Sequence, residues 1–155
     1  MSLTVTTPTD REIVLTRTFA ASRELLFEAY TRADLLTEWY GARGWNLIGC
    51  EIDLREGGAY RFTSRGPGGE EMVQAGTVRM LRRPERLELT ELFDHQSYAG
   101  ETLITHEFTE HSGRTTVTTT VRYATQEGRD TVLRYPMARG VTEAGDRLAE
   151  LLAKT

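Results

Sequence analysis

Glu91, His106 and Arg17 each stand on the apolar side of a segment in which apolar and polar residues alternate. In a strand such alternation turns every second side chain to the same face, so the pattern directs all three toward the interior of a sheet. Charged and polar side chains are rarely buried without a partner. We therefore expect either a paired network or a wet cavity. An Arg17–Glu91 ion pair, or strand ends that splay into solvent, would be the purely structural explanation.

The carboxyl of Glu91 and the imidazole of His106 suit two kinds of chemistry. They could orient a polar group of a bound molecule, as the few polar anchors of an apolar small-molecule pocket do. They could also act as an acid and a base, which requires both side chains within hydrogen-bond reach of a common substrate position. That second role needs both residues on the same face of the sheet.

Other catalytic and metal-binding patterns are missing from the sequence. His106 and His111 resemble a zinc-protease pair, but they lie five residues apart in a strand that runs into a turn and would point to different faces. No serine lies in a G-x-S-x-G elbow, and no glycine-rich nucleotide loop is present. Cys50 is the single cysteine, in an apolar alternating run that favours a buried, unreactive thiol. We expect no metal, no cofactor and no covalent catalysis.

Short alternating segments occupy most of the chain between Ile48 and Tyr123 and predict strands. Hairpin signals such as Gly66-Pro-Gly-Gly69 separate them. We expect a curved antiparallel sheet of about six to seven strands. The expected strands are 12–19, 45–54, 59–64, 72–81, 87–93, 102–108 and 115–123.

Two short helices are predicted after the first strand. The first follows Ser22, which can cap it, and continues to Tyr30. The second covers about 32–40 and brings Trp39 close to Trp45 in the loop that follows. Core packing is the commoner fate of such aromatic residues, and a pocket mouth or a partner surface is the alternative.

The last quarter of the chain, 128–155, carries the strongest helical pattern. Pro136 should break or kink this helix near 133–135. We expect the end at Leu148 to close the core and the part from Met137 to Gly145 to roof a cavity. Its apolar stripe consists of Leu133, Met137, Val141, Ala144, Leu148 and Leu152.

Composition bounds the remaining possibilities. The chain has 155 residues, 39% of them hydrophobic, which is enough for one domain with its own core. We expect a flexible tail at 1–10 and a single domain over 11–155. The formal charge of -4 is spread along the chain, so neither a nucleic acid nor a membrane surface is expected as partner. No signal peptide or membrane-spanning run is visible, which favours the cytoplasm.

An ordered set of motifs resembles a known family over roughly residues 11 to 153. The motifs are Arg17-Thr-Phe-Ala-Ala-Ser-Arg-Glu-Leu-Leu-Phe-Glu-Ala29, Leu36-Thr-Glu-Trp39, Asp53-Leu-Arg-Glu-Gly-Gly58, Gly76-Thr-Val, Pro84-Glu-Arg-Leu87, His106-Glu-Phe-Thr-Glu110, Arg129-Asp-Thr-Val-Leu and Met137-Ala-Arg-Gly-Val-Thr-Glu-Ala-Gly-Asp-Arg-Leu148. They resemble the activator of Hsp90 ATPase homologue 1-like family, of the START-like and Bet v 1-like (SRPBCC) superfamily. This resemblance implies an α+β helix-grip fold, in which an antiparallel sheet curls around a C-terminal helix over a cavity.

The resemblance implies less about function, since this fold carries many activities. Our first hypothesis is a protein that binds a small hydrophobic ligand, such as a lipid, polyketide or aromatic compound, between sheet and C-terminal helix. One alternative is a cyclase-type enzyme that uses Glu91 and His106. Another is a homodimer, a chaperone partner of the Hsp90 type or a stress-response interaction module, docking through Trp39, Trp45 and Arg43. The predicted cavity residues are Trp39, near its mouth, Tyr60, Glu91, His106, Met137 and Val141.

Overall fold

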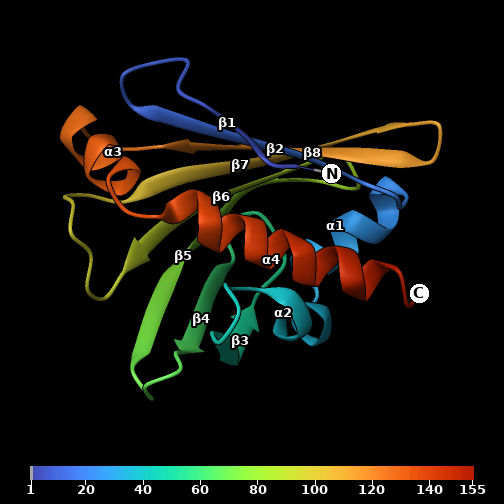
Figure 1. Cartoon of the computed structure of the whole chain (residues 1–155), viewed down its shortest axis with the longest axis horizontal. Coiled ribbons are helices and arrows are strands. Elements are labelled where there is room, and N and C mark those ends of the chain that lie inside the picture. The colour runs from blue at the N-terminus through green and yellow to red at the C-terminus, as the bar shows by residue number, and fades with distance from the viewer. Residues whose placement is uncertain (1) are drawn as a thin grey trace.

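The computed structural model describes residues 2–155 and confirms an α+β fold with one antiparallel sheet. The sheet has eight strands in the order β1-β2-β8-β7-β6-β5-β4-β3, so β1 and β3 form its two edges. It curves around helix α4, which lies across its concave side (Figure 1). The strands are β1 Thr4–Thr6, β2 Glu12–Phe19, β3 Asn46–Ile52, β4 Ala59–Arg65, β5 Glu71–Arg82, β6 Arg86–Phe93, β7 Thr102–His111 and β8 Arg114–Arg122.

Strand β1 was not among the seven strands expected from the sequence, and it lies in the stretch 1–10 that was assigned to a flexible tail. Thr4–Thr6 pair antiparallel with Val14–Thr16 of β2 and are exposed. The prediction missed this strand because three exposed residues carry no buried face and hence no apolar alternation. Met1, the first residue of the expected tail, lies outside the described residues.

Two short helices, α1 Arg23–Thr31 and α2 Ala33–Trp39, follow β2 as predicted. The Ser22 hydroxyl accepts a hydrogen bond from the Leu25 amide at 3.2 Å, which is the expected N-terminal cap of α1. The indole N–H of Trp39 donates to the Ala29 carbonyl at 2.9 Å and joins the two helices.

The C-terminal quarter is broken into two helices, α3 Gln126–Leu133 and α4 Met137–Leu152. The prediction of one apolar stripe from Leu133 to Leu152 was therefore wrong at its first residue, since Leu133 lies on α3 and is 39% exposed. The break falls next to Pro136, where the sequence analysis expected it, because proline cannot donate the amide that would continue the hydrogen-bond ladder. No helix within residues 2–155 has the length and apolar character needed to cross a membrane.

Helix α4 is buried unevenly along its length. Leu148 is fully buried and Leu152 is 8% exposed, and both join the core with Leu26, Leu36 and Phe108. On the cavity side of its N-terminal half, Met137, Gly140, Val141 and Ala144 are only half-buried. The C-terminal half of α4 thus anchors the helix, as predicted, while its N-terminal half lies over a less densely filled space.

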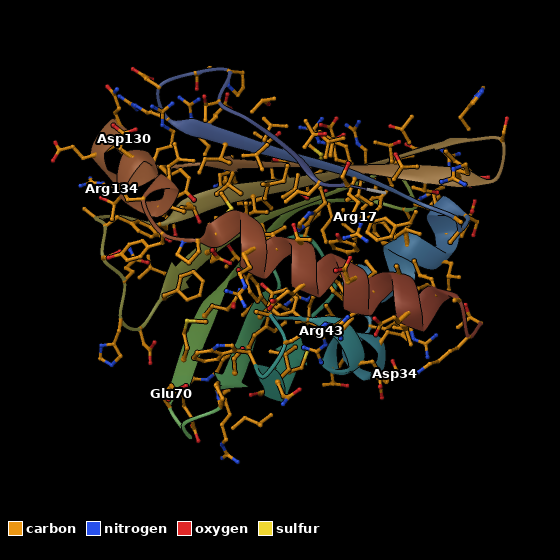
Figure 2. All side chains as sticks on the ribbon, viewed as in Figure 1. Arg17, Asp34, Arg43, Glu70, Asp130 and Arg134 are labelled. Carbon is orange, nitrogen blue, oxygen red and sulfur yellow. The ribbon has the colours of Figure 1, made fainter. Side chains whose placement is uncertain are left out.

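Arg17 links the N-terminal half of α4 to the sheet. The Arg17 side chain lies between the sheet and α4 (Figure 2). From β2 its guanidinium donates to the Thr142 carbonyl at 3.2 Å and to Asp146 Oδ1 at 2.9 Å. Its side chain is only 10% exposed. Gly145 leaves the room for it, since a Cβ there would stand 2.5 Å from Arg17 Nη1. The Arg17–Glu91 ion pair considered from the sequence does not form, because Arg17 reaches the helix instead.

The two glycines of α4 offer a matched test of this arrangement. Gly140→Ala should stabilise the fold by about 0.4–1 kcal/mol, because alanine favours a helix and reduces the freedom of the unfolded chain. A Cβ at 140 meets only Ala42 Cβ at 3.8 Å. Gly145→Ala should instead destabilise the fold, because the new methyl displaces the Arg17 guanidinium from Asp146. Urea unfolding of both variants measures the difference, and equal stabilisation by both would contradict the role given to Gly145.

Candidate functional site

A cavity of about 570 Å³ lies between the concave face of the sheet and α4. Apolar and aromatic side chains from β2, β4, β6, β7 and β8 form its floor, and Met137, Gly140, Val141 and Ala144 of α4 form its roof. The loop 94–100 and Val132 of α3 close one end. This volume is within the range of small-molecule sites in proteins, about 300–1,000 Å³.

All six residues proposed from the sequence line this cavity. Met137 and Val141 come from α4, and the others from four different elements of the sheet and helices. They are Trp39, Tyr60, Glu91, His106, Met137 and Val141. Alternation turns Tyr60, Glu91 and His106 to the inner face, and helical spacing does the same for Met137 and Val141, which is why the sequence could single them out. That they contact a ligand remains a prediction.

Trp39 lies in the wall of the cavity and not at a mouth. It is 5% exposed and packs against Tyr30, with 4.9 Å between ring centroids, and against Tyr40 at 5.6 Å. Trp45 is half-buried, and its ring lies against Gly66. Arg43, the third member of the docking surface considered above, pairs with Glu150 of α4 at 2.6 Å. Trp39 is buried, Trp45 is half-buried and only Arg43 is exposed, so the three side chains do not make one exposed aromatic surface.

The loop between α2 and β3 is held against α4 by Arg147. Its guanidinium donates to the carbonyl of Gly41 at 3.0 Å and to that of Trp45 at 2.9 Å. Burying these loop carbonyls without a donor would be costly. Arg147 thereby fixes the wall formed by Tyr40, Gly41 and Ala42.

His106 is a neutral group at the floor of the cavity. Its Nδ1 lies 2.8 Å from the Thr119 hydroxyl, and its ring packs against Tyr30, with 4.8 Å between ring centroids and the planes tilted by 59°. Burial lowers the pKa of His106 from 6.5 to about 4, because the charged imidazolium is poorly solvated there. At neutral pH the ring can therefore donate or accept a hydrogen bond with a ligand, but it carries no charge.

Glu91 is the buried carboxyl of the cavity. It is 9% exposed, and its Oε2 accepts a hydrogen bond from Gln74 Nε2 at 2.8 Å. Burial raises the pKa of Glu91 from 4.5 to about 7, an effect partly offset by the Thr102 side chain. Within residues 2–155 no arginine, lysine or histidine forms an ion pair with it.

Glu91 and His106 share the inner face of the sheet but lie apart along it. The register pairs Leu87 with His106 and Glu91 with Thr102, so four residues of strand separate the two functional groups. At about 3.3 Å per residue this is about 13 Å along the strands. Both side chains can contact one elongated molecule, but they are poorly placed to transfer protons at a single atom of it.

Several cavity residues were not singled out from the sequence. Gln74 donates its amide hydrogens to Glu91 and to the Tyr40 hydroxyl, which lies 2.8 Å away. Its signal was the alternation of the strand 72–81, which turns it inward with Met72. Tyr123 had the same signal, because it ends the expected strand 115–123 on the face of Val117 and Val121, whereas Tyr98 had none because it lies in a loop.

The described residues offer little for metal or thiol chemistry. Residues 2–155 contain no cluster of three or more histidine, cysteine or acidic side chains that could hold a metal ion. Cys50 is half-buried, and burial raises its pKa to about 11, so the thiol stays protonated and is a poor nucleophile at neutral pH.

Comparison with known proteins identifies a family. The model of the activator of Hsp90 ATPase homolog 1-like protein family matches residues 20–153. A solved structure of a protein from Rhodobacter sphaeroides is 34% identical, with 100% of each chain covered and a TM-score of 0.94. No curated protein matches the sequence.

Two more distant structures share the fold. A protein from Mycobacterium smegmatis is 24% identical over 99% of this chain and 98% of its own, with a TM-score of 0.87. The AHSA1 protein from Silicibacter pomeroyi is 21% identical over 92% of this chain and 98% of its own, with a TM-score of 0.75.

The two buried titratable groups give the stability opposing pH dependences. Because the pKa of Glu91 rises to about 7, the folded protein binds more protons than the unfolded chain between about pH 4.5 and 7. The Glu91 contribution to stability therefore falls as the pH rises through that window. The pKa of His106 falls to about 4, so its contribution is present above pH 6.5 and is lost as the pH falls toward 4.

Glu91→Gln should separate the two effects. Relative to the wild-type protein, we expect this variant to gain stability between pH 5 and pH 8, by up to about 3 kcal/mol, since one pKa unit corresponds to 1.36 kcal/mol. Urea unfolding at each pH measures the difference, with Glu51→Gln on the exposed side of β3 as a control that should track the wild type. A pH-independent difference between Glu91→Gln and wild type would refute the assignment.

Proposed function

This chain belongs to the activator of Hsp90 ATPase homologue 1-like family, and we propose that it binds a small, largely apolar molecule between its sheet and helix α4. The observation that supports this most is the cavity of about 570 Å³. Close packing is the rule in protein interiors, where voids larger than a water molecule are few. A space of this size is large enough for a lipid, polyketide or aromatic ligand.

The walls fit such a ligand in chemistry as well as in size. Apolar side chains such as Val141, Ile104 and Phe62 line most of the space. His106 and Glu91 lie about 13 Å apart along the strands, at the spacing of about 3.3 Å per residue. An elongated ligand would bury its apolar body beneath α4 and place its polar groups near these two side chains.

The end of the cavity at α3 is the proposed entrance. Tyr98 of the loop 94–100 lies against Gly128 of α3, where a Cβ would stand 3.3 Å from Tyr98 Cβ. Next to the break between α3 and α4, Leu133 is 39% exposed and Tyr135 is 59% exposed. Movement of α3 about this break would admit a ligand without disturbing the anchored end of α4.

The two other functions considered from the sequence have weaker support. A cyclase that uses Glu91 and His106 on one atom conflicts with their separation along the strands. A homodimer or a chaperone partner that docks on Trp39 conflicts with the burial of its side chain. The proposed ligand site conflicts with neither observation.

A cavity-filling substitution tests the proposal. Screening lipids and aromatic compounds by thermal unfolding should find ligands that stabilise the wild-type protein by about 2.7 kcal/mol at one hundred times the dissociation constant. Val141→Trp fills the space below α4 and should abolish this response while the protein stays folded. Ala138→Trp adds the same side chain on the exposed side of α4 and should keep it.

Two results would contradict the proposal. One is a screen in which no compound stabilises the wild-type protein. The other is an unchanged response in folded Val141→Trp, which would place binding outside the cavity.

A further inference from the structure

The end of the cavity around Glu91 is lined by polar and tyrosine side chains, whereas the rest of the cavity is mostly apolar. Glu91 projects from β6 in the middle of the sheet, with Gln74 of β5 on one side and Thr102 of β7 on the other. An ionised carboxylate offers about four acceptor sites. Gln74 uses one of these sites, the Thr102 hydroxyl donates to the backbone carbonyl of Glu91 at 3.5 Å, and no cation among residues 2–155 balances the charge.

Four tyrosines from separate segments of the chain line the cavity near enough to this carboxyl for its charge to act on them. In each of the four, burial raises the pKa of the phenol, and the nearby negative charge of Glu91 raises it further. The phenols therefore stay neutral around pH 7 and cannot neutralise Glu91. All four line the cavity; they are Tyr40, Tyr60, Tyr98 and Tyr123.

These rings are held in place by contacts among themselves and with the sheet. The Tyr60 hydroxyl donates to the Thr90 carbonyl at 2.6 Å, and the Tyr40 hydroxyl accepts from Gln74 at 2.8 Å. The Tyr98 and Tyr123 rings meet edge to face at 5.4 Å. The group around Glu91 is therefore a built feature of the fold, with its phenol groups largely fixed before any ligand binds.

A carboxylate among aromatic rings is complementary to an organic cation. The faces of aromatic rings carry negative charge and attract ammonium groups, most strongly where water is excluded. An ammonium ion also supplies the donors and the positive charge that Glu91 lacks. We propose that the ligand of this cavity is an amine with an apolar body, whose ammonium group binds Glu91 among the four tyrosine rings. This inference rests on the proposed ligand-binding function.

The other charged residue of the cavity is poorly suited to hold a ligand. Arg17 could in principle bind an anion, but its two Nη atoms already donate to Thr142 and Asp146. Its Nε has no hydrogen-bond partner within residues 2–155, yet it is buried among neighbouring atoms. The Arg17 charge is balanced by Asp146, whereas within residues 2–155 the Glu91 carboxylate has no cation, so the unbalanced charge in the cavity is negative and favours a cation over an anion.

A neutral hydroxyl would fit the acceptor less completely than an amine. It could donate to Glu91, but it would leave the carboxylate charge uncompensated in an apolar enclosure, which is costly. An ammonium ligand should therefore bind more tightly as the pH rises from 6 to 8 and Glu91 ionises. The titratable groups facing Glu91 are the four tyrosines, and exposed His95 lines the cavity from its loop.

Calorimetry with matched compounds tests the inference on the full chain. The probes are 2-phenylethylamine, 2-phenylethanol and 3-phenylpropionate, together with hexylamine, hexanol and hexanoate as a second apolar body. At pH 8 we expect each amine to bind roughly ten-fold or more tightly than its alcohol and its acid, as expected for a charge-paired ligand. The preference for the amine should be smaller at pH 6 than at pH 8. A His95→Gln variant should show the same decrease between pH 8 and pH 6, so that titration of His95 does not account for it.

Two variants locate the preference. Glu91→Gln, checked by its thermal unfolding, should remove the preference for the amine while keeping binding of the alcohol, and Glu51→Gln should behave as wild type. Tyr98 lies at a half-exposed loop position. Tyr98→Leu should weaken amine binding about three-fold and have little effect on alcohol binding. This difference measures the contribution of the aromatic ring to amine binding while Glu91 is kept.

The outcomes distinguish this inference from the function on which it rests. Amines that bind no better than the alcohols, or not at all, overturn the inference, and so does a preference that survives in Glu91→Gln. If the alcohols or compounds from the broader screen still bind, the cavity remains a ligand site and only the amine is excluded.

Discussion

The Arg17 guanidinium joins the sheet to helix α4 across the cavity, and the arrangement of the site depends on it. The C-terminal half of α4 is held by apolar burial at Leu148 and Leu152. Its N-terminal half has no comparable packing, because the residues below it face the cavity. There the hydrogen bonds from Arg17 to Thr142 and Asp146 replace apolar contact and keep the helix above the sheet.

This polar link explains why a cavity can persist beneath a helix. Filling an interior with apolar side chains normally stabilises a fold, and a large void forfeits those contacts. Here Gly145 has no side chain, so the Arg17 guanidinium can lie against the backbone of α4. The helix is thus fixed by directional hydrogen bonds, and its position does not require the space below Val141 to be filled.

Burial of ionisable groups indicates that stability has been given up for another property. Glu91 lies in the sheet with no cation as partner, and its raised pKa is the measure of an unfavourable environment for the charge. Glutamine in its place would avoid this cost. Departures of this kind are expected at functional sites, and in this chain they coincide with the cavity. The fold alone would not indicate a function, since it carries many activities.

The sequence by itself determined the fold class, most of the strands, the two short helices and the break at Pro136. It also identified which side chains face inward, because alternation with a period of two and the spacing of helical residues are local properties. The position of Glu91, His106 and Val141 in the cavity follows from the same rule. The same rule could not predict the short strand β1, since its residues have no buried face.

Only the tertiary structure decided what those side chains meet. Arg17 pairs with Asp146, 129 residues away in the chain, and not with Glu91, because the path of α4 over the curved sheet sets that distance. The same curvature buries Trp39 in a wall and gathers four tyrosines from separate elements around Glu91. Contacts of this kind depend on register, curvature and the placement of a distant helix, and no local pattern in the sequence encodes them.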